Sequence, residues 1–175
     1  MARAGRATNI EPEREVQFAF LHLPDAPVEP LAGLARISGN QARAPRIEVR
    51  NRSDRAIRHL EIGWILRDRQ GREFLAGSVP AEVTIEPGGR VRIAPETALR
   101  ISERAGQPVA LDGVTGYVAQ VEFADGRVWV PSRAALAGDP KLARTAAPSP
   151  EEQRLTELYR KKGLGALVAE LKRFQ

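Results

Sequence analysis

Two histidines are the side chains of this sequence best suited to acid–base or metal chemistry at neutral pH. His59 stands two residues before Glu61, so both side chains share one side of any strand that contains them. A protein zinc site takes three or four ligands, and His22, between Leu21 and Leu23, has no partner next to it. The sequence therefore predicts no metal site.

The serines and aspartates stand where backbone structure explains them. Several serines lie at turns, strand ends or a helix cap, and none has the G-x-S-x-G setting of an exposed nucleophile: Ser53, Ser78, Ser102, Ser132 and Ser149. Asp68, Asp112 and Asp125 lie at predicted turns, where aspartates bond the backbone. No helix follows Gly88-Gly89, as a phosphate loop requires. We predict no catalytic residue, no cofactor and no enzymatic activity.

The composition is basic and lacks cysteine. The 175 residues carry a net charge of +5, and the absence of cysteine excludes disulfides, thiol catalysis and thiolate metal sites. Basic residues alternate with acids, as in Arg67-Asp68-Arg69, and aromatic residues make up only 5% of the chain. A nucleic-acid arm has runs of like charge, and base stacking needs aromatic rings. We therefore expect a protein partner rather than a nucleic acid.

No stretch of the sequence reaches the ~18 apolar residues of a membrane-spanning helix. The first residues, Met1 to Asn9, contain arginines but no apolar segment behind them, unlike a secretory signal. We expect either a cytoplasmic protein or a trimmed part of a longer one.

Alternating apolar residues predict a series of short strands. The pattern begins at Val16, Phe18 and Phe20 and sharpens from residue 45 onward. Turns are predicted at 68–71, where Gly71 closes a three-residue loop, and as hairpins at 87–89 and 125–126. Strands of ~5–7 residues with turns every ~8–12 predict an all-β immunoglobulin-like sandwich over 14–133, best supported at 45–133.

The two ends of the chain have a different composition. Residues 1–13 lack periodicity and predict a flexible leader, and the Ala, Gly and Pro of 134–148 predict a linker. A capping box at Ser149–Glu152 opens a helical tail over 149–175, and Gly163 suits a helix C-cap. Apolar stripes on both sides of Gly163 predict two short amphipathic helices.

The middle of the chain resembles the FxLYD type of bacterial extracytoplasmic immunoglobulin-like modules. Trp64-Ile65-Leu66-Arg67-Asp68, followed by Gly71, resembles the Phe-x-Leu-Tyr-Asp strand end and its glycine turn, with Trp64 for Phe and Arg67 for Tyr. Val49-x-Asn51-x-Ser53 and Ile85-x-Pro87-Gly88 are similar to two further turns of that family. The resemblance implies a β-sandwich outside the cytoplasm, with an adhesive or accessory role and no catalytic residues.

A second apolar face is predicted on the side of the sheet away from the core. In a two-residue hairpin at 125–126, Phe123 opposes Val128, Val121 opposes Val130, and Glu122 opposes Trp129. In the three-residue loop closed by Gly71, Leu66 opposes Phe74, Trp64 opposes Ala76, and Ile65 opposes Leu75 on the reverse face. The predicted outer face carries Ile65, Leu75, Val118 and Trp129. Either a partner covers it, or the tail does so through Leu164, Leu167, Val168 and Leu171.

These features favour a non-catalytic protein-interaction module, or an accessory subunit of a larger assembly. The alternative is a sensor or scaffold domain excised from a longer membrane-anchored bacterial protein. Two other classes stay open. One is a hydrolase in which His59 or the turn carboxylates converge in a pocket, and the other is nucleic-acid binding through arginines.

Overall fold

The computed structural model describes residues 12–96, 98–101, 110–143 and 150–174. The chain forms two compact units, Met1–Ser132 and Arg133–Gln175. Most of the predicted leader, Ser102 and the predicted cap at Ser149 lie outside the described residues.

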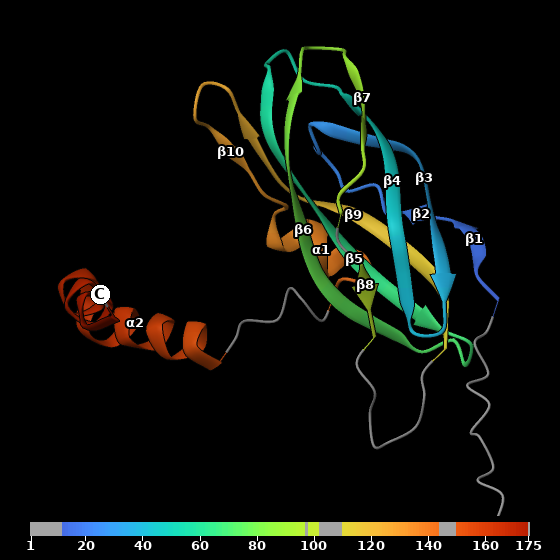
Figure 1. The fold of residues 1–175 in the computed structure, drawn as a ribbon. Coiled ribbons are helices and arrows are strands. Elements are labelled where there is room, and N and C mark those ends of the chain that lie inside the picture. The colour runs from blue at the N-terminus through green and yellow to red at the C-terminus, as the bar shows by residue number, and fades with distance from the viewer. Residues whose placement is uncertain (1–11, 97, 102–109, 144–149, 175) are drawn as a thin grey trace, which may run out of the picture. The chain divides into compact units, whose positions relative to one another are not determined.

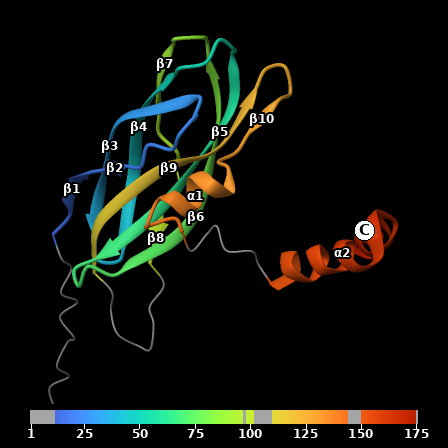
Figure 2. The ribbon, with the colours of Figure 1, turned by 180° about the vertical axis from the view of Figure 1, so that it is seen from behind.

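The first unit consists of two β-sheets (Figure 1). Sheet 1 has the strand order β1-β3-β4-β7, with β8 also paired to β4: β1 Arg14–Gln17, β3 Val28–Ser38, β4 Gln41–Asn51, β7 Arg90–Ile93, β8 Leu99–Arg100. Sheet 2 has the order β10-β9-β5-β6, with β2 parallel to β9: β2 Ala19–Phe20, β5 Ile57–Asp68, β6 Glu73–Ile85, β9 Leu111–Phe123, β10 Val128–Trp129. From behind, β9 carries β10 at its end (Figure 2).

Both sheets contribute to a single apolar core, as in a β-sandwich. Ile47 and Val49 of β4 face inward from sheet 1, while Leu60, Ile62 and Trp64 of β5 face inward from sheet 2. The predicted alternation in these strands is confirmed, and the first unit is all-β. The indole of Trp64 is fully buried and meets the Phe18 ring edge-on, with the ring centroids 5.1 Å apart.

One long strand was not predicted from the sequence, and one turn was predicted to join two paired strands although it joins the two sheets. The eleven-residue β3 pairs along β4, but bulges between Pro30 and Ala32 and between Leu34 and Arg36 break the alternation that would have revealed it. The predicted hairpin at 87–89 is wrong, because β6 belongs to sheet 2 and β7 to sheet 1. The Pro-Gly-Gly turn therefore carries the chain from one sheet to the other.

Asn51, at the end of β4, holds that crossover in place. Its fully buried amide donates from Nδ2 to the carbonyl oxygens of Arg55, at 2.7 Å, and of Ile85, at 3.0 Å. Its Oδ1 accepts from the backbone N–H of Ser53 at 2.9 Å and from the Ser53 hydroxyl at 2.7 Å. One side chain thus links the end of β4, the following turn and the end of β6.

Asp68 organises the loop between β5 and β6. Its Oδ1 accepts from the backbone N–H groups of Gln70 and Arg72, both at 2.9 Å, and its Oδ2 accepts from Nε of Arg72 at 2.7 Å. The backbone bond from Asp68 N–H to Arg72 O closes a three-residue loop, as predicted. The predicted pairs Leu66–Phe74 and Ile65–Leu75 follow from it and are confirmed.

Strand β6 is an edge strand that pairs with β5 alone among the described strands. Its thirteen residues are interrupted twice. Gly77 has a positive φ of 79° beside the register shift opposite Gly63–Ile65, and Pro80 lacks a backbone N–H. The bulge leaves Trp64 without the predicted Ala76 partner in the ladder.

The second unit is helical: α1 Arg133–Gly138, α2 Pro150–Leu171 and a 3-10 turn Lys172–Phe174. Gly163 breaks α2 into two helices with a φ of 78°, a conformation that costs other residues energy, so the two predicted helices are present. Arg154 joins them, with Nη1 2.8 Å from Glu170 and Nη2 2.6 Å from Glu151. The hydrogen bond from Arg154 also lowers the pKa of Glu151. The prediction of a linker over 134–148 is corrected in part, because this segment contains most of helix α1 and the fully buried Leu142.

Replacement of Asn51 by alanine should destabilise the first unit strongly. The change leaves two carbonyl oxygens without their donor, and a buried unsatisfied polar group costs about 1–3 kcal/mol. We expect Asn51→Ala to lower the free energy of unfolding by about 3 kcal/mol, measured by urea denaturation. Asn40→Ala, which loses one bond to the Ile101 carbonyl, is the matched control, at about 1 kcal/mol. Equal losses in the two variants would contradict the role of Asn51.

Asp68 should make the first unit less stable in acid. Burial acts to raise the pKa of this carboxyl, but the hydrogen bonds from Arg72 and Gln70 outweigh it and hold the pKa below its ordinary value. The stabilisation is therefore present above the pKa of the unfolded chain and is lost as the pH falls through the lower, folded value. We expect the urea concentration at the unfolding midpoint to be lower at about pH 3 than at about pH 6. The decrease should be smaller in Asp68→Asn. An identical fall in both proteins would assign the acid sensitivity to other groups.

Candidate interaction surfaces

The β9–β10 hairpin differs by one residue from its predicted register. Phe123 N–H bonds to Arg127 O at 2.9 Å, and Gly126 N–H bonds to Phe123 O at 3.0 Å, so the loop has three residues rather than two. Gly126 has the positive φ, 83°, that this loop needs. The observed pairs are Val128–Glu122 and Trp129–Val121. The predicted pairs Phe123–Val128, Val121–Val130 and Glu122–Trp129 are therefore wrong.

This shift moves Trp129 from the predicted outer face to the inner side of sheet 2. A slip of one residue turns every side chain of a strand over. Trp129 now lies opposite the fully buried Val121 and packs, half-buried, against the core. Val118 is also a core residue, because the register shift after Glu61 aligns it with Ile62. Neither residue belongs to an outer docking surface.

The outer face of sheet 2 keeps two of its four predicted residues and contains one that the sequence did not reveal. Ile65 is buried outside the core cluster, and its partner Leu75 is 53% exposed. Tyr117 lies over Gly63, where a Cβ atom would come within 2.6 Å of the Tyr117 hydroxyl oxygen. Burial raises the pKa of Tyr117. Only the bulged β5–β9 register identifies Tyr117 as outward-facing.

The four predicted tail residues lie in the second helix of α2. Leu164 is 64%, Val168 42% and Leu171 47% exposed, while Leu167 is half-buried. Tyr159 of the first helix is 50% exposed. Docking of these residues on sheet 2 stays a prediction.

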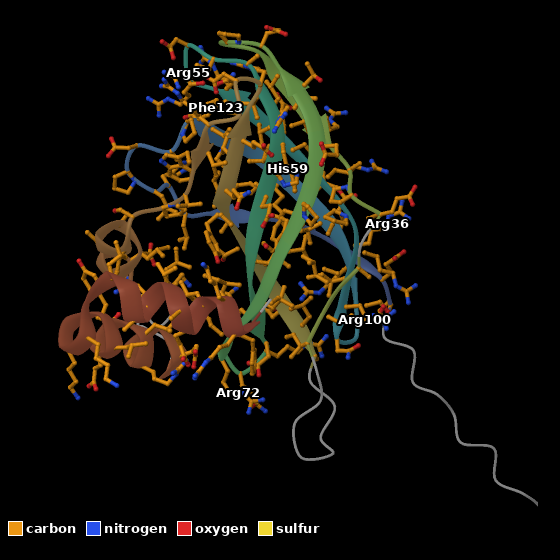
Figure 3. All side chains as sticks on the ribbon, turned by 90° about the vertical axis from the view of Figure 1, so that its left-hand side faces the viewer. Arg36, Arg55, His59, Arg72, Arg100 and Phe123 are labelled. Atoms are coloured by element: carbon orange, nitrogen blue, oxygen red, sulfur yellow. The ribbon has the colours of Figure 1, made fainter. Side chains whose placement is uncertain are left out.

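His59 lies on β5 (Figure 3), and its ring stands between two carboxylates. Its Nδ1 lies 2.9 Å from Oε1 of Glu82, and its Nε2 lies 3.6 Å from Oε1 of Glu61. The Ser78 hydroxyl donates to Oε2 of Glu61 at 2.8 Å. A catalytic triad requires the imidazole to accept the serine proton directly. Here Glu61 stands between Ser78 and His59, so the arrangement differs from a triad. The sequence missed this cluster because Ser78 and Glu82 come from β6.

The other candidate chemical residues do not join His59. The two imidazole nitrogens point in opposite directions, so Glu61 and Glu82 lie on opposite sides of the ring. Within the described part of the chain, no three His, Asp or Glu side chains are placed to hold a metal ion. His22 lines a pocket of about 40 Å³, enough for a water molecule. Asp112 and Asp125 stand at opposite ends of the thirteen-residue β9.

The outer face of sheet 1 carries a set of exposed arginines, which we call the arginine face. In β4, Ile47 and Val49 face the core, so Arg46, Glu48 and Arg50 face outward. The same alternation and the strand register place seven arginines on this face: Arg36, Arg43, Arg46, Arg50, Arg90, Arg92 and Arg100. Figure 3 labels Arg36 and Arg100 at its right-hand side.

Most of the arginine face has no ionic partner within the described residues. Arg36 lies 3.9 Å from Glu13, and Arg43 bonds to the Gln41 side chain rather than to a carboxylate. By contrast, Arg67, on the outer face of sheet 2, lies 3.3 Å from Asp112.

Among the described helices, none is long and apolar enough to cross a membrane.

Comparisons with known proteins add little. No family model matches the chain, and no curated protein matches it. Among solved structures, one described as "X-ray structure of Northeast Structural Genomics Consortium target SoR45" is similar, with 14% sequence identity and a TM-score of 0.34. The similarity covers 69% of this chain and 82% of that one. A similarity at that score supports no argument about fold or function.

Trp129 and Leu75 should respond differently to truncation. Burial of a tryptophan in a core is worth about 3–5 kcal/mol, and Trp129 is half-buried, so we expect Trp129→Ala to cost about 2 kcal/mol in urea denaturation. Leu75→Ala should stay within about 0.5 kcal/mol of the parent chain, because its side chain is exposed. A larger loss of unfolding free energy in Leu75→Ala than in Trp129→Ala would favour the predicted hairpin register over the observed one.

Proposed function

We propose that this chain is a non-catalytic protein-interaction module, built on an immunoglobulin-like sandwich and acting as an accessory subunit of a larger assembly. The observation that carries the proposal is the exposure of large apolar side chains on the helical tail. Leu164, Val168 and Leu171 of one helix and Tyr159 of the other are each between 42% and 64% exposed. Apolar residues at helical spacing are typical of a helix that enters a groove on a partner.

The FxLYD resemblance supports the immunoglobulin-like part of the proposal. Its matching residues do structural work in this chain: Leu66 is buried, Asp68 binds the turn backbone, and Asn51 links the two sheets. The resemblance also favours a location outside the cytoplasm. A sensor or scaffold domain of a longer membrane-anchored bacterial protein is the alternative, and a membrane helix encoded directly upstream would favour it.

The decisive experiment separates a partner surface from packing within the chain. Leu164→Gln with Val168→Gln removes apolar contacts from one helix face, and Thr156→Gln with Ala169→Gln is the matched control at exposed positions. We expect the first pair to reduce capture of a bound protein from the native organism at least tenfold (about 1.4 kcal/mol). Its Tm should change by less than about 2 °C.

Two results would contradict the proposal. A fall in Tm of about 4 °C or more, with capture unchanged, would mean that these side chains stabilise the chain itself. Capture lost equally in the control pair, or no protein held specifically by the parent chain, would remove the tail as a binding surface.

A further inference from the structure

We propose that the arginine face of sheet 1 binds an acidic segment of a partner protein. This inference rests on the proposed function, since it names a second surface of the same module and the chemistry of what that surface binds.

Two pairs of arginines lie across neighbouring strands of this face. Arg50 lies directly opposite Arg90, and Arg36 directly opposite Arg43, in antiparallel strands. Like charges in such cross-strand pairs repel each other. The strand on the other side places Glu29 opposite Arg50 and Glu15 opposite Arg36, which offsets part of this repulsion. A ligand that supplies further negative charge offsets the rest.

The charge balance of the face points to an acidic ligand. Glu15, Glu29 and Glu48 share the outer face with the seven arginines, and Glu13 lies beside Arg36, so seven guanidinium groups face four carboxylates and the surface is net positive. The outer face of sheet 2 is net negative, with Glu61, Glu73, Glu82 and Glu122 on it beside Arg58 and Arg67. Positive charge is thus concentrated on one side of the first unit, where it attracts an oppositely charged partner.

A shallow depression on this face indicates the kind of acidic ligand. It measures about 190 Å³, and it is lined by Ala32, Gly33 and Leu34 of β3, by Arg46, Ile47 and Glu48 of β4, and by Arg92 of β7. Small and apolar side chains thus lie next to two exposed guanidinium groups. Such a depression takes an aliphatic side chain, while neighbouring carboxylates of the same segment meet the guanidinium groups in paired hydrogen bonds.

Nucleic acid fits this face less well than an acidic protein segment. Glu48 stands between Arg46 and Arg50 on β4 and opposite Arg92 on β7, where it would repel a phosphate backbone. The strands of sheet 1 place no aromatic ring on this face, so single-stranded bases have nothing on which to stack. A protein segment of mixed composition can place a donor near Glu48 and carboxylates near the arginines.

The test uses the full chain and three fluorescent probes in anisotropy titrations. The probes are a peptide of glutamates interrupted by leucines and serines, whose hydroxyl groups can donate to Glu48, a short DNA duplex, and vesicles containing phosphatidylserine. We expect the peptide to bind best and its affinity to fall as salt rises from about 50 to 200 mM, since exposed charges are screened. A peptide with glutamine in place of every glutamate should not bind.

Variants locate the binding on the arginine face. Arg50→Gln with Arg90→Gln should weaken peptide binding about tenfold. It should leave the Tm within about 2 °C, because it removes the Arg50–Arg90 repulsion together with the attraction between Arg50 and Glu29. Arg67→Gln with Arg127→Gln changes the net charge equally, lies elsewhere, and should leave binding within about twofold.

Three outcomes would overturn the inference: no peptide binding at low salt, tighter binding of DNA or vesicles than of the peptide, or equal loss in both double variants. None of these outcomes concerns the helical tail. The proposed function would therefore still hold if Leu164→Gln with Val168→Gln abolished capture of the partner protein. Loss of the tail effect with peptide binding intact would instead remove the proposed tail surface alone.

Discussion

The buried amide of Asn51 is the constraint on which the two-sheet arrangement depends. Its two donors and its acceptor oxygen are all occupied, by carbonyls of the next turn and of β6 and by Ser53. Backbone bonds between Asn51 and both Gly88 and Gly89 add to the same junction. Because β4 belongs to sheet 1 and β6 to sheet 2, these bonds set how the sheets meet at one end. The core fills the space that this junction defines.

Two hairpin loops of the same type show what the sequence can and cannot predict. At Asp68–Arg72, a glycine three residues after the last strand position indicated a three-residue loop, and the pairs Leu66–Phe74 and Ile65–Leu75 were predicted correctly. At Phe123–Arg127, the Asp-Gly dipeptide favours a two-residue turn by local preference. Asp125 instead occupies the middle of a three-residue loop, with its Oδ1 bonded to Arg127 N–H. A difference of one residue decided whether Trp129 faced outward or inward.

The arginine face shows a similar limit for charge. Along the chain, arginines and glutamates alternate with apolar residues, and the charges look evenly mixed. Only strand register determines that arginines of β3, β4, β7 and β8 come together on one side. The strand β3 could not be found from alternation, because its bulges break the pattern. The all-β class and the two tail helices, by contrast, depend on local periodicity and were predicted from it.

The interruptions in β6 bear on how copies of this chain behave at high concentration. An uninterrupted edge of thirteen residues would offer a neighbouring copy a long template for adding a strand, which is a common route to aggregates. Pro80 cannot donate to such a strand, and the turn of the backbone at Gly77 bends the edge away from a straight ladder. Intermolecular sheet growth along β6 is therefore limited to short stretches on either side of these two residues.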